Sequence, residues 1–299
     1  MGVDYELSGS KNGFTDIPDI FSRALVLFWR FFHPSSIEFR AFFRILRPIT
    51  KYIMNILVCI SSVPDTTSKI SFTDNNTRLD TAGITWIIGP YDDYALARAV
   101  ELKEASGSGN ITVIHVGGPE SEPVIRKALA IGADEAVRID ATASDGFFVA
   151  AQIAAYARDK NFDLILMGRE SIDYNSGIVH GLVAEYLGIP AVSPVMRLDV
   201  SGKEATMDRE IEGGKETLSA SLPLVLGCQE PIAEWKIPSM RGIMSARTKP
   251  LQVIPPVAAG SGLQFQKYEL PAPRTSCRMV DSSEVNQLVQ LLKSEAKVI

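Results

Sequence analysis

ITVIHVGGPESEPVIRKALAIGADEAVRI, which spans residues 111–139, is the stretch that decides the fold class of this chain. Residues 111–116 and 135–139 are short apolar runs, which predict two buried β-strands. Between them lie a Gly-Gly-Pro turn signal at residues 117–119 and an apolar periodicity typical of an α-helix, formed by Val124, Ala128 and Leu129. A strand, a helix and a second strand joined by short links predict parallel strands with a right-handed crossover.

The same alternation continues on both sides of this stretch. Further strands are predicted at residues 55–60 and 162–167, and further helices at residues 91–106, 145–160 and 176–187. The strands are apolar with little interruption, as expected when helices cover both faces of a sheet. The sequence therefore predicts a mostly parallel, doubly wound, Rossmann-like sheet.

After Pro194 the pattern changes. Residues 196–200, 205–211 and 217–226 are strand-like and divided by glycines, which predicts an antiparallel continuation of the sheet. Pro, Gly, Ser and Ala dominate residues 255–273, which predicts an extended arm. A final amphipathic helix is predicted at residues 282–297, with an apolar face formed by Val285, Leu288, Val289 and Leu292. The predicted fold class is therefore α/β, with antiparallel additions and a C-terminal arm.

The composition excludes several classes of protein. A chain of 299 residues with 46% hydrophobic and 22% charged residues fits one large globular domain or two small ones. Three cysteines argue against a disulfide framework and fit a reducing compartment, which predicts a cytoplasmic location. The net charge of −5 argues against a nucleic-acid-binding protein, because such proteins usually carry a basic surface.

The first 53 residues differ in composition from the rest. They hold eight of the 13 phenylalanines, and their seven Lys or Arg against five Asp or Glu give a net charge of +2, which leaves −7 for residues 54–299. Their longest apolar run, residues 24–29, is too short to span a bilayer. Three interpretations fit: an amphipathic segment on a membrane or partner surface, a helical extension packed on the main domain, or an upstream artefact of a chain that starts at Met54.

Small residues gather at the predicted carboxyl ends of the strands, where ligands bind in open parallel sheets. The most prominent loop runs from Gly168 to Gly177 and leads into the helix predicted at residues 176–187. Backbone N–H groups at a helix start attract anions, so we hypothesise phosphate binding at this loop. The loop lacks the phosphate-binding motifs of other folds, and its alternative role is helix capping by Asp173, Asn175 and Ser176.

No catalytic constellation is evident in the sequence. The histidines, His33, His115 and His180, are scattered, and His115 lies inside an apolar strand, which favours a core position. The cysteines, Cys59, Cys228 and Cys277, lack metal-ligand spacing. The residues alone predict a nucleotide-binding α/β domain without an active site of its own.

Several motifs resemble the β subunit of the electron transfer flavoproteins. The most specific is DREIEGGKETL at residues 208–218, followed by LPLV at residues 222–225, which is very similar to the family's signature. Other similar motifs follow in family order: NILVC at 55–59, VPD at 63–65, ALAIGAD at 128–134, FDLILMG at 162–168, SID at 171–173, IP at 237–238 and GIM at 242–244. The resemblance covers about residues 55–254, nearly all of the chain after the extension.

The resemblance implies a heterodimer with an α subunit that holds a redox FAD. Electrons would enter from flavin dehydrogenases, such as acyl-CoA dehydrogenases, and leave toward a membrane quinone reductase or another acceptor. The chain would then be an electron carrier subunit rather than an enzyme, with a fold like that of the adenine nucleotide alpha hydrolases.

In that family the β subunit binds AMP, or a second FAD in members that bifurcate electrons, and the resemblance leaves this choice open. The positions that match the family's nucleotide site are Cys59, Gly89, Pro90, Tyr91, Asp92, Gly117, Gly168, Arg169, Ile172, Asp173, Asn175, Ser176, Gly177, Ile178 and Val179. Where many members have an Asn or a Gly-Gln pair, this chain has residues 176–178, so backbone groups are expected to replace side-chain contacts to phosphate. Thr66 stands where some members carry a tyrosine near the α-subunit flavin.

Three further residues match positions that contact partners in the family. Ile237 is the best match for the apolar anchor of the recognition loop, which binds the partner dehydrogenase, and Met240 is the second candidate. A buried loop position is the alternative for Ile237. Glu210 matches a glutamate that meets an α-subunit arginine as the flavin domain swings, with a plain surface charge as its alternative.

The expected organisation has three parts. Residues 1–53 form the N-terminal extension, residues 54–257 an electron transfer flavoprotein β-type nucleotide-binding domain, and residues 258–299 a C-terminal arm and helix that contact the α subunit. Two other classes compete with this interpretation: a nucleotide-hydrolysing or adenylating α/β enzyme, and a stress-type ATP-binding module without redox partners. The enzyme would need a phosphate-loop motif or catalytic lysine and a metal carboxylate, and we find neither in the sequence.

Overall fold

The structure, a computed structural model, describes residues 53–273 and 276–299. The three interpretations of the N-terminal extension concern residues 1–52, which lie outside this described part. Within the two described ranges, no helix has the length and the apolar character needed to cross a membrane.

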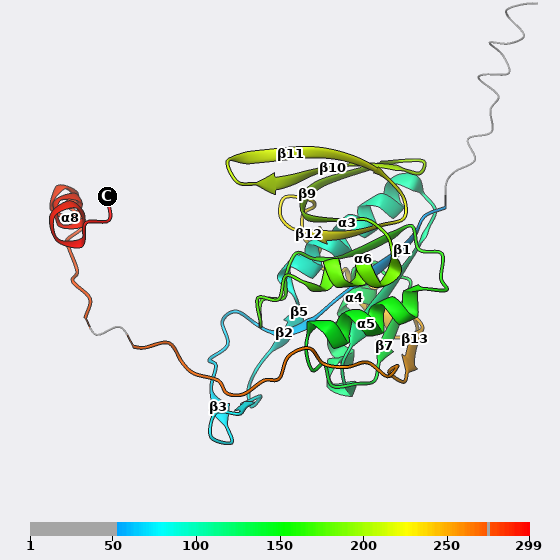
Figure 1. Cartoon of the computed structure of the whole chain (residues 1–299), viewed down its shortest axis with the longest axis horizontal. Helices are drawn as coiled ribbons and strands as arrows, with labels where there is room; N and C mark the ends of the chain where they lie inside the picture. Colours follow the sequence, from blue (N-terminus) through cyan, green and yellow to red (C-terminus); the bar gives the residue numbers. More distant parts are fainter. Residues whose placement is uncertain (1–52, 274–275) are drawn as a thin grey trace, which may run out of the picture. The chain divides into compact units, whose positions relative to one another are not determined.

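A nine-stranded sheet forms the centre of the fold, in the order β11-β10-β9-β12-β8-β1-β6-β7-β13 (Figure 1). Seven strands of this sheet, from β9 to the edge strand β13, pair in parallel with one another in the order given. They are β9 (Ala191–Ser201), β12 (Leu224–Cys228), β8 (Leu164–Gly168), β1 (Asn55–Cys59), β6 (Asn110–Val116), β7 (Glu135–Ile139) and β13 (Leu251–Ile254). Strands β10 (Glu204–Ile211) and β11 (Gly214–Ser221) continue the sheet in antiparallel pairing. The predicted fold class is confirmed.

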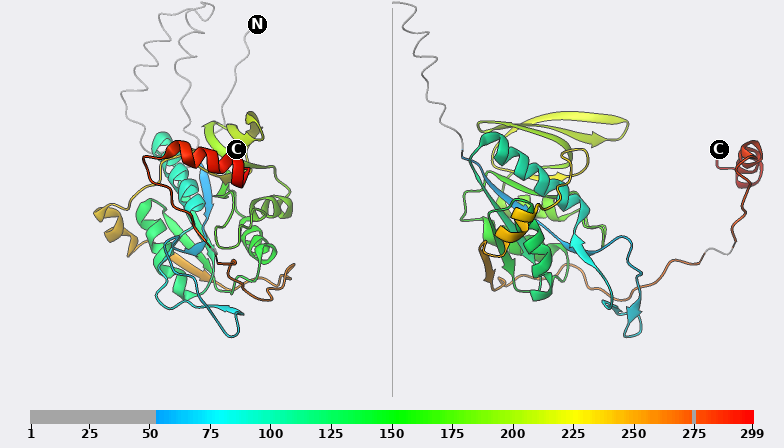
Figure 2. Two further views of the ribbon diagram at one scale, coloured as in Figure 1. Left: turned by 90° about the vertical axis from the view of Figure 1, so that its left-hand side faces the viewer. Right: turned by 180° about the vertical axis from the view of Figure 1, so that it is seen from behind.

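Helices cover both faces of the sheet because alternate strand residues point to opposite sides. Ile56 and Val58 of β1 belong to a buried core with residues of α3 (Pro90–Ser106) and α4 (Glu122–Ile131). Leu57 and Cys59 belong to a second core with residues of α5 (Gly146–Ala157) and α6 (Val179–Leu187). Helices α5 and α6 lie in front of the sheet in Figure 1, and the view from behind in Figure 2 shows α3 on the other face.

The strand order reverses between β1 and β8. From β1 the chain passes to β6 and β7 on one side, and then returns to form β8 on the other side of β1. In sheets of this kind the crevice outside the carboxyl ends of two such strands is the usual ligand site. The fold therefore places the ends of β1 and β8 at the expected site.

One predicted strand is wrong. Residues 217–226 form the ends of two strands, because β11 stops at Ser221 and β12 begins at Leu224. Pro223 between them has no N–H for a ladder bond. Moreover, β12 is not antiparallel: it lies parallel between β8 and β9 in the middle of the sheet.

The sequence did not predict several short elements. They are the pair β2 (Ser62–Pro64) and β5 (Trp86–Ile88), the pair β3 (Phe72–Thr73) and β4 (Arg78–Leu79), the 3-10 turn Pro119–Ser121, the edge strand β13, and helix α7 (Met240–Ala246). The arm was predicted as extended, and its described residues contain no helix or strand from 255 to 284. The final helix is shorter than predicted: α8 (Val285–Leu291) runs into a π-helical turn at Leu292–Ala296.

Candidate functional site

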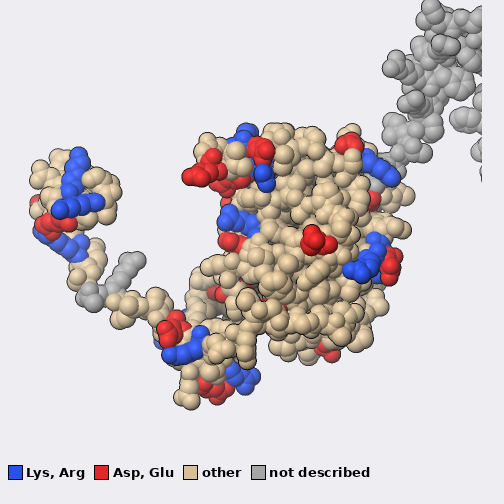
Figure 3. Space-filling view, in the orientation of Figure 1, with Lys and Arg blue, Asp and Glu red and all other residues tan. Residues whose placement is uncertain are grey.

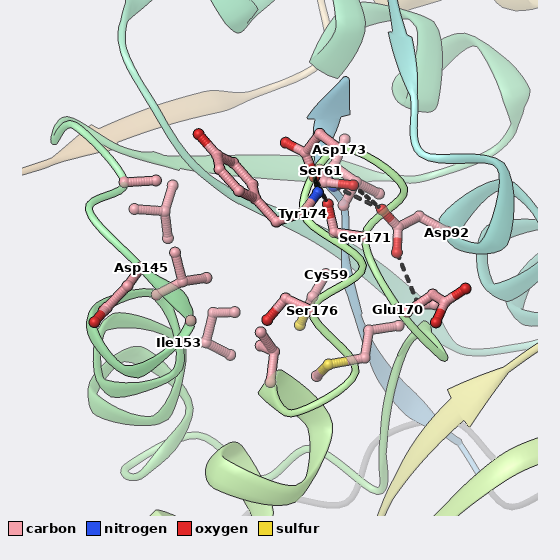
Figure 4. Close-up of a pocket in the computed structure, with 18 of the residues that line it drawn as sticks. Cys59, Ser61, Asp92, Asp145, Ile153, Glu170, Ser171, Asp173, Tyr174 and Ser176 are labelled. Atoms are coloured by element: carbon pink, nitrogen blue, oxygen red, sulfur yellow. Dashed lines mark hydrogen bonds between the residues drawn. The ribbon is translucent and has the colours of Figure 1, made fainter. Parts of the chain in front are cut away.

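A cavity of about 650 Å³ lies at the carboxyl ends of β1 and β8. Its volume is within the range of small-molecule and cofactor sites. Figure 4 shows Asp145, the residue before α5, and Ile153 of α5 on one side, Asp92 on the other, and Cys59 and Ser176 between them. The cavity thus occupies the crevice at which the strand order reverses.

The structure brings part of the predicted nucleotide site to this cavity. The predicted residues that line it are Cys59, Asp92, Gly168, Arg169, Asp173, Ser176 and Val179. The other predicted residues lie outside the lining: Gly89, Pro90 and Tyr91 at the start of α3, Gly117 after β6, and Ile172, Asn175, Gly177 and Ile178 in the loop after β8. Their role in binding stays a prediction.

The Asp92 carboxylate joins the two loops that follow β1 and β8. It lies in the first turn of α3, is 6% exposed, and accepts hydrogen bonds from the Ser61 backbone N–H at 2.8 Å and the Ser61 hydroxyl at 2.5 Å. Its second oxygen accepts the Gly168 N–H at 2.7 Å. A Cβ atom at Gly168 would lie 2.7 Å from this oxygen and from the Tyr91 Cβ, so a glycine is required for the approach. Asp92 therefore fixes the spacing between the two walls of the cavity.

Burial controls the ionisation of the groups beside this contact. Burial raises the pKa of Asp92 to about 6, although the bonds from Ser61 and Gly168 oppose the shift. Burial and the nearby Asp92 charge raise the pKa of the Cys59 thiol well above its usual value. Since a thiolate is the reactive form of cysteine, Cys59 is a packing group in the cavity wall rather than a nucleophile.

We expect Asp92 to make the stability of the chain depend on pH. Its pKa is about 6 in the folded chain and near 4 when unfolded, so the folded state binds the extra proton between these values. The free energy of unfolding should therefore fall as the pH rises from about 4 to about 6, by up to about 1.4 kcal/mol per pH unit for this group. Asp93, whose pKa burial also raises to about 6, acts in the same direction.

The measurement is urea unfolding of the parent and of Asp92→Asn across this pH range. The variant should lose the part of the fall that belongs to Asp92 and keep the part that belongs to Asp93. Identical pH profiles for the two chains would contradict the expectation.

The loop after β8 differs from the prediction in where its helix begins. Helix α6 starts at Val179, three residues after Ser176, and its N-cap residue makes no side-chain capping bond. Asp173 instead accepts the Tyr174 N–H at 3.0 Å within the loop, and Asn175 adopts a left-handed φ of 49°. The predicted capping of this helix by residues 173, 175 and 176 is therefore wrong, because these residues close a turn. The first turn of α6 still reaches the cavity through Val179 and His180.

The sequence did not reveal several of the lining residues. His115, predicted as a core residue, is 8% exposed, donates from Nδ1 to the Ile60 carbonyl oxygen at 2.9 Å, and also lines the cavity. Asp145 precedes α5, and its Oδ1 accepts the Phe148 N–H at 2.8 Å as a helix cap. Residues 263–266 come from the C-terminal arm. Only the Asp145 cap has a local sequence signal; the other contacts depend on tertiary structure.

The candidate partner residues lie outside the cavity and at the surface. Ile237 is 75% exposed and Met240, the first residue of α7, is 76% exposed, so the alternative that Ile237 is buried is wrong. Glu210 is exposed on β10 and accepts a hydrogen bond from Gln229 Nε2 at 2.6 Å. Gln229 Oε1 in turn accepts from Arg169 Nη1 at 2.7 Å. A chain of contacts thus links Glu210 to the loop that lines the cavity.

The doubly wound sheet and the cavity at its switch point define a Rossmann-like α/β protein. The family model described as "Electron transfer flavoprotein domain" matches residues 77–259. The chain is 36% identical over 260 residues to the electron transfer flavoprotein subunit beta of Bacillus subtilis (strain 168), which covers 82% of this chain and 100% of that protein. This chain belongs to the electron transfer flavoprotein family, as a β subunit, and the predicted family is confirmed.

Two further relatives agree with this assignment. The electron transfer flavoprotein subunit beta of Syntrophomonas wolfei is 35% identical over 249 residues, which cover 82% of this chain and 98% of that protein. Subunit CarD of the caffeyl-CoA reductase-Etf complex of Acetobacterium woodii is 29% identical over 259 residues, with the same coverage of each chain.

Proposed function

We propose that this chain is the nucleotide-binding subunit of a cytoplasmic heterodimer that carries electrons from flavin dehydrogenases to a membrane quinone reductase or another acceptor. The observation that carries the proposal is the cavity at the ends of β1 and β8, whose lining includes seven of the positions that match the family's nucleotide site. The redox FAD would be held together with the α subunit, and it would supply the electron-accepting chemistry.

The cavity has the features that a nucleotide requires. Val116, Val149 and Ile153 give it an apolar wall suited to a flat base. The first turn of α6 presents backbone N–H groups suited to a phosphate. Among the described residues that line the cavity, Arg169 is the one Lys or Arg side chain, and a single positive charge favours a ligand with few phosphates, such as AMP or the AMP half of FAD, over a triphosphate.

The surface offers two kinds of partner contact. Helix α5 contains no charged residue and α6 only Glu185, and charged side chains are sparse over the middle of this face (Figure 3). Helix α8 has no buried residue and exposes Val285, Leu288 and Val289. We propose that the apolar surfaces of α5, α6 and α8 bind the α subunit. Ile237 and Met240 would bind the dehydrogenase. Because one relative is named as part of a caffeyl-CoA reductase-Etf complex, oxidoreductases of CoA esters are included among the partners.

The test is electron transfer by the whole heterodimer, made by co-expression with a candidate α subunit. Adding an acyl-CoA dehydrogenase and its substrate should bleach the visible absorbance of the heterodimer's flavin. A matched reaction without the heterodimer controls for the dehydrogenase's own flavin. A flavin-containing heterodimer that no flavin dehydrogenase reduces would contradict the proposed role.

A further inference from the structure

The first part of the C-terminal arm, residues 257–268, contacts the cavity that we assign to the nucleotide. Four of its residues line the cavity: Leu263, Gln264, Phe265 and Gln266. From the sequence, the whole arm was expected to serve the α subunit. Three sets of contacts hold this part of the arm to its own domain instead.

The first contact is made by Gln152 on α5. Its side chain is 2% exposed, and its Nε2 donates to the Val257 carbonyl oxygen at 2.9 Å. Its Oε1 accepts the Val257 N–H at 2.8 Å. The side-chain amide therefore satisfies both backbone groups of Val257, as a neighbouring β-strand would, and fixes the start of the arm on α5.

The second contact is made by Asp145 at the start of α5. While Oδ1 caps the helix, Oδ2 accepts the Ser261 hydroxyl at 3.0 Å, the Gly262 N–H at 2.6 Å and the Leu263 N–H at 2.7 Å. Partial burial raises the pKa of Asp145, but the bonds from Phe148 and from residues 261–263 outweigh it and lower the pKa below its ordinary value. A single carboxylate oxygen thus gathers three donors of the arm.

The third contact is made by Tyr268 with the β3–β4 hairpin and with the loop after β8. Its ring stacks on Phe72 with centroids 4.7 Å apart and an interplanar angle of 3°, and its N–H donates to the Asn76 carbonyl oxygen at 2.7 Å. Its hydroxyl lies 3.5 Å from that of Tyr174, which belongs to the loop after β8 and lines the cavity. Between Leu263 and Tyr268 the arm therefore runs from the start of α5 to the loop after β8.

We propose that residues 257–268 form a strap that completes the nucleotide site and slows the release of its ligand. Asp145 and Gln152 are positioning residues, because their hydrogen bonds go to the strap and, for Asp145, also to the first turn of α5. This inference rests on the proposed function, since it takes the ligand of the cavity to be a nucleotide. The arm then has two parts with different roles. The strap contacts the cavity, and the residues after it contact the α subunit.

The test is the rate at which the purified heterodimer releases labelled AMP, or FAD where FAD is the bound nucleotide, into an excess of the unlabelled compound. Asp145→Asn keeps one oxygen for the helix cap but replaces the oxygen that accepts three donors by an NH₂ group, which cannot accept. Loss of hydrogen bonds to a charged group should speed release at least about tenfold. Tyr268→Ala removes the third contact and the packing of Tyr268 on Phe265, keeps every lining side chain, and should also speed release.

Asp281→Asn is the matched control. It makes the same substitution in the arm beyond the strap, where Asp281 accepts the Ser283 N–H at 2.9 Å and the Ser283 hydroxyl at 2.6 Å. Its release rate should equal that of the parent. Because Tyr268 lies outside the buried core, Tyr268→Ala keeps the test open if Asp145→Asn weakens α5.

Hydrogen exchange gives a second readout that needs no ligand. The amides of Val257, Gly262, Leu263 and Tyr268 donate the bonds that hold the strap, so they should exchange slowly in the parent and faster in both variants. If the parent holds a nucleotide and both variants match its release rate and its hydrogen-exchange rates, the strap proposal is overturned. The proposed function is then unaffected. A heterodimer that binds neither AMP nor FAD would overturn the proposed function and the strap together.

Discussion

Replacing Asp92 by Ala should lower the free energy of unfolding by on the order of 3 kcal/mol and leave the purified heterodimer with little nucleotide in the β subunit. The Asp92 carboxylate accepts the N–H and hydroxyl of Ser61 and the N–H of Gly168, and it is almost completely buried. Alanine leaves these donors without an acceptor, and each buried unsatisfied donor costs about 1–3 kcal/mol. The loops after β1 and β8 would also lose the group that sets their spacing. Urea unfolding and nucleotide analysis of the same preparation measure both effects.

Asp93→Ala is the control, because Asp93 lies next to Asp92 in the first turn of α3 but does not line the cavity. Asp93 faces Lys127 at 3.8 Å, and its Oδ1 has no hydrogen-bond partner in the described part of the chain. Its loss should not lower the stability at neutral pH, because burial disfavours its charged form, and it should leave the nucleotide content unchanged. If Asp92→Ala keeps both its stability and its nucleotide, Asp92 does not hold the two walls of the cavity.

Truncating the apolar anchor of the partner surface is expected to weaken docking to a flavin dehydrogenase by roughly 30-fold or more. Ile237 and Met240 both project from the surface, with about three quarters of each side chain exposed. An exposed aliphatic side chain that fills a pocket on a partner contributes most of its energy only on binding, so its loss leaves the fold intact. The measurement is the KM for the heterodimer in dehydrogenase-driven flavin reduction, with Ile237→Ala and Met240→Ala made separately.

The larger of the two effects identifies the anchor. Val253→Ala serves as control, because Val253 is also exposed but lies on the edge strand β13, outside both partner surfaces. The control should keep the parental KM, and all three variants should keep the parental nucleotide content. Parental KM values for both Ile237→Ala and Met240→Ala would show that this surface does not bind the dehydrogenase.

The sequence predicted the parts of the fold that depend on local pattern. The apolar runs of β1, β6 and β7 are buried strands, and the position of the cavity follows from the order in which the chain visits them. Such runs carry their own signal, because a strand covered on both faces has no need for polar residues.

The errors arose where tertiary contacts outweigh local pattern. Ser176 has the character of a helix cap, but it pairs with Ser171 in an isolated bridge that closes the loop before α6 begins. Residues 217–226 look like one strand, yet the two halves join different neighbours in the sheet. The contribution of the arm to the cavity could not be predicted either, because Asp145 and Leu263 meet across 118 residues of sequence.

The nucleotide content of the purified heterodimer decides whether this chain is a nucleotide-binding subunit. The chain, co-expressed and purified with a candidate α subunit, is denatured, and the supernatant is analysed for FAD and AMP. We expect about two nucleotides per heterodimer: one FAD with one AMP, or about two FAD if the complex is of the bifurcating type. A heterodimer that contains no flavin under any condition would show that this chain is not part of an electron-carrying flavoprotein.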